Sequence, residues 1–261
     1  MKVAILAGGL GSRLLEETRV KSKAMVPIGD HPILWHILKH YEAHGFGHFV
    51  IALGYQGDSI RSFFEGLGTR RAPIAKGDQM VAFPAVEPGW TVELIETGLE
   101  TLSGGRIKRL APYLDAAPFM LTWCDGLSDV DLHELRAFHE GHGRIATLTA
   151  IHPPSRFGRL TLEDDRVVAF REKDPDAGEW INGAFFVLNP EVFDYIAGDQ
   201  TQFEQEPLTR LAADGQLMAY RHRGFWQCMD TLPEAQLLTR LWEEGAAPWK
   251  VWRNHARPAD R

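Results

Sequence analysis

A glycine-rich turn near the start of the chain, followed by two cations, could bind phosphate. Residues 6–13 read LAGGLGSR, and Lys23 lies ten positions after Arg13. Glycine has no Cβ, so the backbone N–H groups of such a turn can approach a phosphate closely. Arg13 and Lys23 would add positive charge beside a polyphosphate. We therefore expect a nucleoside triphosphate as ligand and transfer at phosphorus as the chemistry, with a purely structural strand-to-helix turn as the alternative.

The spacing differs from that of two common glycine-rich phosphate sites. A P-loop requires Gly-x-x-x-x-Gly-Lys-Ser/Thr, which this sequence lacks. A dinucleotide site has Gly-x-Gly-x-x-Gly at the start of a helix and an acidic residue about 20 positions later. The pattern here is Gly-Gly-x-Gly-x-Arg. It indicates neither a P-loop nor a dinucleotide site.

Two aspartates could hold a divalent cation on the triphosphate. Asp125 follows the apolar run Phe119–Trp123, and Asp230 follows a second apolar run near the end of the chain. Mg²⁺ is often bound by one or two carboxylates together with phosphate oxygens. Helical segments follow both aspartates, so each could instead cap a helix. Spacing alone leaves both possibilities open.

Two motifs in the second half could bind a sugar phosphate. Residues 170–173 read FREK and place a carboxylate and an amine at a strand end, while residues 180–183 read WING and place an amide and a bare glycine before a strand. Glu, Lys and Asn side chains can hydrogen-bond sugar hydroxyls and a phosphate. If either motif stood alone, a hairpin ion pair or an Asn-Gly turn would be the default interpretation.

Three histidines, His36, His40 and His44, recur at every fourth position of one expected helix. That spacing would suit a zinc pair, but we expect a solvated helix face instead. The two cysteines, Cys124 and Cys228, form no Cys-x-x-Cys motif and no disulfide framework, which indicates buried thiols.

Apolar periodicity predicts alternating strands and helices in the first half of the chain. The expected strands are Lys2–Leu6, Phe49–Leu53, Thr91–Ile95 and Phe119–Trp123. The expected helices are Ile33–His44, Ser59–Phe64 with Asp58 or Ser59 as its cap, Ile107–Leu114 and Asp129–His142. This order predicts an α/β fold with a doubly wound, mostly parallel sheet, whose ligand site lies at the carboxyl ends of the strands.

From about Arg144 the pattern becomes richer in strands. The expected strands are Ala146–Ile151, Arg159–Leu162, Val167–Arg171 and Ile181–Leu188, and the expected helices are Glu204–Ala213 and Leu232–Glu244. The stretch Gly66–Gly89 has little periodicity and predicts a long excursion. We expect a single domain over residues 1–261, with a nucleotide-binding half (1–143) and a smaller β-rich half (144–261) for the sugar phosphate.

Composition narrows the class of partner. The 261 residues are 44% hydrophobic and have a net charge of −7, which argues against a nucleic-acid binder or a binder of anionic membranes. No apolar run approaches the roughly 18 residues that a membrane span needs. The sequence starts directly with a core strand, so we expect neither a signal peptide nor a membrane partner, and a cytoplasmic enzyme.

Together these residues make the chain resemble the sugar-phosphate nucleotidyltransferases and, within them, the glucose-1-phosphate cytidylyltransferases. The matching segments follow in order over nearly the whole chain: 5–14, 16–18, 32–36, 103–109, 125–131, 156–158, 180–188, 204–208, 224–231 and 247–252. The resemblance implies a Rossmann-like nucleotidyltransferase fold. It also implies that an NTP, CTP in the named group, reacts with a sugar 1-phosphate, here glucose 1-phosphate, to give an NDP-sugar and pyrophosphate.

The resemblance also implies a role for each matching residue. Arg13 and Lys23 would be catalytic, and Asp125 and Asp230 would be ligands of Mg²⁺. The nucleotide would contact Leu6, Ala7, Gly8, Gly9, Gly11, Ser12, Arg13, Lys23, Thr101, Arg106 and Cys124. The sugar phosphate would contact Gly126, Glu172, Lys173, Asn182 and Gly183.

Because the family forms oligomers, we expect a homo-oligomer. The excursion and the tail Trp249–Trp252 are candidate contact surfaces.

Several positions depart from the family pattern near the expected site. Ser22 and Ala24 stand where the family has prolines around its key lysine, and Cys124 stands where a glycine usually precedes the metal-binding aspartate. Pro27, Asp174 and Cys228 also differ. These departures leave two alternatives open: a cytidylyltransferase for another phosphate or phosphonate acceptor, and a non-catalytic relative that binds nucleotide and regulates a partner.

Overall fold

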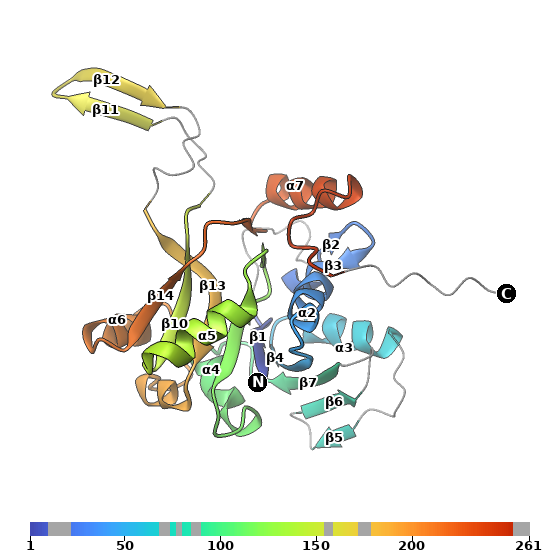
Figure 1. Ribbon diagram of the computed structural model, residues 1–261. Coiled ribbons are helices and arrows are strands. Elements are labelled where there is room, and N and C mark those ends of the chain that lie inside the picture. Colours follow the sequence, from blue (N-terminus) through green and yellow to red (C-terminus); the bar gives the residue numbers. More distant parts are fainter. Residues whose placement is uncertain are drawn as a thin grey trace.

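A nine-stranded sheet forms the centre of the computed structural model, which describes residues 1–9, 22–67, 74–76, 80–84, 90–153, 159–171 and 179–252 (Figure 1). In spatial order its strands are β14 (Leu217–Arg221), β10 (Ala146–Ile151), β13 (Ile181–Leu188), β8 (Phe119–Trp123), β1 (Val3–Leu6), β4 (His48–Leu53), β7 (Thr91–Glu96), β6 (Met80–Pro84) and β5 (Ile74–Lys76). Only β13 and β6 run against the others in this described sheet. The predicted mostly parallel sheet is confirmed.

Helices cover both faces of this sheet because its central strands are apolar on both sides. In β1, Val3 and Ile5 face one core, while Ala4 and Leu6 face the other. The first core is covered by α2 (Ile33–Ala43), α3 (Gly57–Gly66), α5 (Leu132–His142) and α7 (Leu232–Glu243), and the second by α4 (Ser103–Leu110) and α6 (Glu206–Ala213). This is the doubly wound α/β arrangement that the alternating pattern predicts.

Four helix starts differ from the sequence-based expectation. The helix α6 begins at Glu206 rather than Glu204. The helix α4 begins at Ser103 rather than Ile107, because Gly104 and Gly105 let it pack tightly on the segment before α6; a Cβ on Gly105 would lie 2.5 Å from the Cα of Asp199. The helix α5 begins at Leu132, where the Asp131 side chain caps it. The helix α3 begins at Gly57 after Gln56, so the expected caps Asp58 and Ser59 are wrong.

Edge strands account for the other differences. The stretch expected to be an irregular excursion contains β5 and β6, which extend the sheet beyond β7. At the opposite edge, β14 pairs with β10 although no strand was expected there. The hairpin β11 (Arg159–Glu163) and β12 (Arg166–Arg171) forms as predicted, with Asp164 in the left-handed region of its turn (φ 53°), and it projects away from the body (Figure 1).

Crossing a membrane would need a longer and more apolar helix than any found in the described part of the chain.

The histidine face of α2 is buried, so the expectation that it is solvated is wrong. His36 is fully buried and His40 is nearly so. The ring of His36 lies 3.0 Å from the Ile28 carbonyl through Nε2 and accepts a hydrogen bond from the indole of Trp249 through Nδ1 (3.3 Å). These partners fit the neutral ring with its proton on Nε2. Within the described residues, no group of three or more His, Cys, Asp or Glu side chains could hold a metal ion.

We expect His36 to make the fold less stable in acid. Burial lowers the pKa of His36 to about 4 in the folded chain, against about 6.5 when unfolded. Between these values the unfolded state binds more protons, so stability decreases as the pH falls from about 6.5 towards 4. His36→Gln can still donate to Ile28 and accept from Trp249, yet it does not titrate. Urea unfolding at pH 7.5 and 5.5 should show that the variant loses about 1 kcal/mol less than the wild type; equal losses would contradict the prediction.

Candidate active site

A cavity of about 380 Å³ opens at the carboxyl ends of β1 and β8. The two strands are parallel neighbours with Leu6 opposite Trp123, so the turn after β1 and the acidic segment after β8 meet at one edge of the sheet. The expected site residues that line the cavity are Leu6, Gly8, Gly9, Lys23, Thr101, Arg106, Cys124, Asp125 and Asp230. Residues from five separate parts of the chain therefore converge where parallel strands place a ligand.

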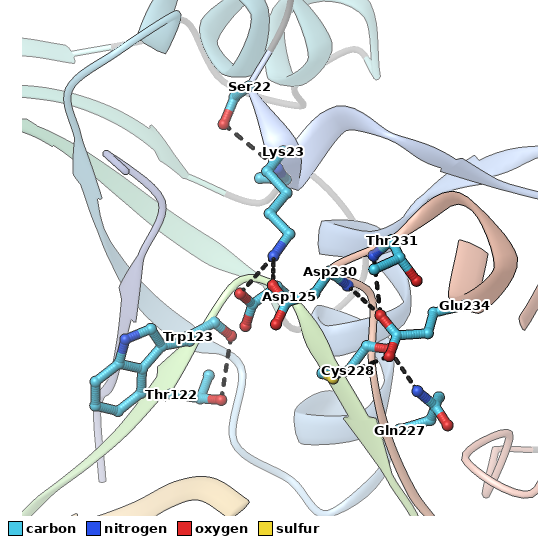
Figure 2. Close-up of polar contacts among 11 residues, drawn as sticks. Ser22, Lys23, Thr122, Trp123, Asp125, Gln227, Cys228, Asp230, Thr231 and Glu234 are labelled. Atoms are coloured by element: carbon cyan, nitrogen blue, oxygen red, sulfur yellow. Dashed lines mark hydrogen bonds and ion pairs between the residues drawn. The ribbon is translucent and has the colours of Figure 1, made fainter. Parts of the chain in front are cut away.

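Lys23 lies between the two aspartates expected to bind metal (Figure 2). Its Nζ is 2.8 Å from Oδ2 of Asp125 and 2.6 Å from Oδ1 of Asp230. Burial alone would lower the pKa of Lys23, but the charge of Asp125 and hydrogen bonds to both carboxylates outweigh it and raise the pKa well above its usual value. Lys23 is therefore a permanent cation, held at a point that both carboxylates face.

Ser22 fixes the backbone of this lysine. It precedes the 3₁₀ turn η2 (Lys23–Met25), and its hydroxyl accepts from the N–H of Ala24 (3.4 Å) and donates to the carbonyl of Ala7 (3.3 Å). Its own N–H donates to Oγ of Ser59 (3.1 Å). A proline, the residue usual in the family here, has no N–H and no hydroxyl. In this chain, hydrogen bonds replace the constraint that the proline ring would provide.

A short antiparallel ladder brings the two aspartates together. Asp125 precedes β9 (Gly126–Ser128), and Asp230 follows β15 (Trp226–Cys228), with Gly126 opposite Cys228. The ladder continues in a hydrogen bond of 2.8 Å from the N–H of Met229 to the carbonyl of Asp125. The helix-cap alternative is wrong for both residues, since a strand follows Asp125 and Thr231, not Asp230, is the N-cap of α7.

Arg106 packs under the glycine-rich turn. Its Nη1 donates to the Leu53 carbonyl (2.9 Å) and to Oγ1 of Thr97 (2.6 Å), and its Nη2 donates to the Leu99 carbonyl (3.2 Å). A Cβ on Gly8 would lie 2.3 Å from Nη1, so a larger residue there would displace the guanidinium from these bonds. Arg106 thus holds the ends of β4 and β7 against the turn, and its expected contact with nucleotide stays a prediction.

The expected sugar-phosphate residues are only partly described. Asn182 and Gly183 lie inside β13, so the Asn-Gly turn alternative is wrong. Oδ1 of Asn182 accepts from the N–H of Ala184 (2.9 Å), and the Gly183 carbonyl accepts from the indole of Trp226 (2.7 Å). Gly126 lies beside the same indole. Gly11, Ser12, Arg13, Glu172 and Lys173 lie outside the described residues, so their roles stay predictions.

Five residues that line the cavity were not expected: Leu99, Glu100, Leu102, Ser103 and Trp123. Trp123 directly precedes Cys124 and Asp125 at a strand end, so its position next to an expected metal ligand could have identified it. The others lie in the loop after β7 and at the start of α4, a region without strong periodicity. Leu99 is 66% exposed, which places an apolar side chain at the mouth of the cavity.

Comparison with known proteins shows the family to which the chain belongs. The nucleotidyl transferase family model matches residues 2–231. The chain is 49% identical over 257 residues to glucose-1-phosphate cytidylyltransferase of Salmonella typhi, a match that covers 97% of this chain and all of that protein. It is 41% identical over 258 residues to a probable glucose-1-phosphate cytidylyltransferase of Bacillus subtilis (strain 168), again over 97% of this chain and all of the relative.

Solved structures share the fold at much lower identity. HddC from Yersinia pseudotuberculosis superposes with a TM-score of 0.69 at 20% identity, covering 92% of this chain and 99% of that one. A UDP-glucose pyrophosphorylase complexed with UDP-glucose has a TM-score of 0.68 at 15% identity, covering 94% and 98%. At such identities the likeness concerns the fold alone, and it confirms the expected nucleotidyltransferase fold.

Proposed function

Because the chain belongs to the nucleotidyl transferase family, it is a nucleotidyltransferase, and we propose that it converts CTP and glucose 1-phosphate to CDP-glucose and pyrophosphate. The main support is the convergence of Lys23, Asp125 and Asp230 on a cavity beside the glycine-rich turn. The choice of CTP and glucose 1-phosphate rests on the 49% identity to a glucose-1-phosphate cytidylyltransferase over that relative's full length.

The reaction needs alignment and charge neutralisation more than proton transfer. A phosphate monoester has a second pKa near 6, so the phosphate of the sugar is already a dianion at neutral pH and can attack without a general base. It attacks the α-phosphorus of CTP in line with the departing pyrophosphate. The protein must hold both substrates in that geometry and neutralise the growing negative charge, which is how positioned cations contribute most to such reactions.

The two aspartates fit Mg²⁺. Both carboxylates already lie 2.6–2.8 Å from one cationic nitrogen, so the pocket between them accommodates a cation. Two carboxylates also match the way proteins bind Mg²⁺, which usually keeps its remaining positions for phosphate oxygens and water. Mg²⁺, when bound, supplies charge neutralisation to the phosphates. Asp125 and Asp230 would hold it there.

Lys23 would then act on the phosphates. In the structure its ammonium pairs with both aspartates. With CTP bound, the triphosphate would attract the ammonium to its oxygens, and Asp125 and Asp230 would then be available to hold Mg²⁺. There it stabilises the negative charge that develops on the leaving pyrophosphate, and Arg13 would add to this from the glycine-rich turn.

A nucleotide panel tests the proposed function. Pyrophosphate release is measured with Mg²⁺ and glucose 1-phosphate for CTP, UTP, dTTP, ATP and GTP, with a control that lacks the sugar phosphate. We expect turnover with CTP and little with the other four. No pyrophosphate release with any of the five nucleotides would refute the proposed reaction. If CTP then raised the melting temperature, the protein would either use another acceptor or bind nucleotide without catalysis. Turnover of CTP with a different sugar phosphate or a phosphonate would identify it as an enzyme for another acceptor.

We also propose a homo-oligomer formed through the projecting hairpin of β11 and β12. Val167 and Val168 are adjacent in β12, so their side chains lie on opposite faces, yet they are 50% and 39% exposed. An isolated two-stranded hairpin is at best marginally stable in water. A second copy of the chain packed against both faces would bury these valines. In the tail, Trp249 is fully buried in the core of its own chain, whereas Val251 is 43% exposed, so the tail stays a second candidate surface.

The oligomer proposal predicts how two aspartate variants behave. Changing both Val167 and Val168 to Asp places charge on each face of the hairpin and should lower the mass measured by light scattering to that of a smaller assembly or a monomer. Leu232→Asp is the control, because Leu232 is 47% exposed and lies outside both the hairpin and the tail. Its mass should match the wild type. A wild-type monomer, or an unchanged mass of the double variant, would contradict the proposal.

A cytoplasmic location is proposed on the chemistry of the cysteines. Cys124 and Cys228 are both free thiols. Free thiols are typical of proteins in reducing compartments, whereas secreted proteins more often pair theirs.

A further inference from the structure

A buried carboxylate to which the proposed reaction gives no role lies directly behind Asp230 (Figure 2). Glu234, in the first turn of α7, is only 9% exposed. Its Oε2 accepts the N–H of Asp230 (2.8 Å) and the N–H of Thr231 (2.9 Å). Its Oε1 lies 3.9 Å from Sγ of Cys228, whose thiol donates to it. One side chain therefore binds three residues of the turn that contains Asp230.

This arrangement exceeds what the helix requires. Thr231 and Glu234 form a capping box, in which the glutamate at the third helical position accepts the N–H of the N-cap residue. The additional bond goes to the residue before the cap, which is Asp230 itself. On its other side, Met229 is bonded to the Asp125 carbonyl. The peptide of Asp230 is thus fixed both by the strand ladder to Asp125 and by Glu234.

We propose that Glu234 is a positioning residue for the metal site. It holds the backbone of Asp230 so that the Asp230 carboxylate faces the same cation as Asp125. The inference rests on the proposed function, since it concerns the Mg²⁺ that the two aspartates would bind. Removing a residue that orients a metal ligand typically lowers metal affinity or activity about 10- to 100-fold.

The charge of Glu234 suits this role. A second carboxylate close to Asp230 would repel it, but two backbone N–H groups and the N-terminal end of α7 offset that repulsion. Hydrogen bonds to an ionised acceptor are stronger than those to a neutral one, so the carboxylate holds the peptide more firmly than an amide would. We therefore expect a graded series in which Glu234→Gln lies between the wild type and Glu234→Ala.

A merely structural role for Glu234 predicts a different result, and α5 offers the matched control. Asp131, the N-cap of α5, likewise accepts two backbone N–H groups at a helix start, with Oδ1 accepting from those of His133 (2.8 Å) and Glu134 (3.0 Å). Neither of these residues is an expected metal ligand. If Glu234 only stabilised its helix, Glu234→Ala and Asp131→Ala would both lower the melting temperature. Neither variant would then change the affinity for the metal ion.

The test uses Mn²⁺ as the probe. Its binding to the full-length protein is measured by electron paramagnetic resonance in the presence of CTP. We expect Glu234→Ala to raise the Mn²⁺ dissociation constant about tenfold or more and Glu234→Gln to raise it about threefold. Asp131→Ala should leave the dissociation constant unchanged. If Glu234→Ala does not fold, the threefold loss in Glu234→Gln is the deciding value. Mn²⁺ binding is measured without turnover, so the result does not depend on the acceptor.

Two results would overturn the inference in distinguishable ways. Wild-type Mn²⁺ affinity in both Glu234 variants, or an equal loss in Asp131→Ala, would refute the positioning role and leave the proposed function intact. A wild-type protein that binds no Mn²⁺ with CTP would refute both.

Discussion

Replacing Lys23 with alanine is expected to lower kcat about a hundredfold or more. The side chain is only 10% exposed and its ammonium is held by two carboxylates at the edge of the cavity. In the proposed reaction it is a principal cation for the leaving pyrophosphate, and removing one positioned electrostatic stabiliser typically costs about 10²–10³ in kcat. The measurement is pyrophosphate release at saturating CTP and glucose 1-phosphate. Activity within about threefold of the wild type would contradict a catalytic role for Lys23.

The same substitution should have the opposite effect on metal binding without nucleotide. In the structure the Lys23 ammonium lies between Asp125 and Asp230, where a cation would bind, so a metal ion must displace it. Lys23→Ala leaves two carboxylates facing each other without that cation. We expect Mn²⁺ to bind the nucleotide-free variant about tenfold more tightly than the wild type, because the repulsion from a nearby positive charge is removed.

Lys23→Arg is the control for this gain in metal affinity. It keeps a positive charge between the aspartates, so its nucleotide-free Mn²⁺ affinity should stay near that of the wild type. If Lys23→Ala binds Mn²⁺ no better than Lys23→Arg, then the ammonium and the metal ion do not compete for the two carboxylates.

The convergence at the site could be predicted from the sequence because it follows from the topology of a parallel sheet. Gly8 follows β1 and Asp125 follows β8, and the carboxyl ends of neighbouring parallel strands share an edge. Asp230 required more, since its place depends on the antiparallel pairing of β15 with β9 across about a hundred residues. The ion pairs of Lys23 with both aspartates could not be predicted, because they depend on the rotamers of three side chains.

Where the fold differed, tertiary packing overrode local preference. Gly104 and Gly105 have low helix propensity and obscured the first turn of α4, yet their missing side chains let that turn pack on Asp199 and Thr201. The short strands β5, β6 and β14 lie toward the two ends of the sheet, and pairing with their neighbours defines them more than local pattern does. His36 was expected in water by its residue type, but the Ile28 carbonyl and the Trp249 indole satisfy its ring in the core.

Asp125→Asn is the second substitution with a large expected effect, and it should separate activity from stability. The asparagine keeps the shape of the side chain but loses half of the charge that would bind Mg²⁺. A metal ion in such a site contributes several kcal/mol of charge stabilisation, which corresponds to about a thousandfold in kcat. We expect a loss of that size in pyrophosphate release, only partly recovered at high Mg²⁺ concentration.

The fold should tolerate the same change. The two carboxylates share the Lys23 ammonium in the structure. Asp125→Asn removes the repulsion between the two aspartates, and Lys23 keeps Asp230 as its partner at 2.6 Å. The side chains of Asp125 and Asp230 are 29% and 23% exposed, so solvent screens part of the change. The melting temperature of the ligand-free variant should therefore equal or slightly exceed that of the wild type.

The decisive comparison measures the same variant with and without Mg²⁺ and CTP. The wild type should gain thermal stability when both are added, because they bind only the folded state, and Asp125→Asn should gain much less. Asp230→Asn should show the same pair of effects, since Lys23 keeps Asp125 as its partner at 2.8 Å. If either variant unfolds at a clearly lower temperature than the wild type without ligands, then both carboxylates are needed to hold Lys23 and the fold depends on this site. An inactive variant with an unchanged melting temperature would instead indicate that the charge here serves the substrates and their metal ion.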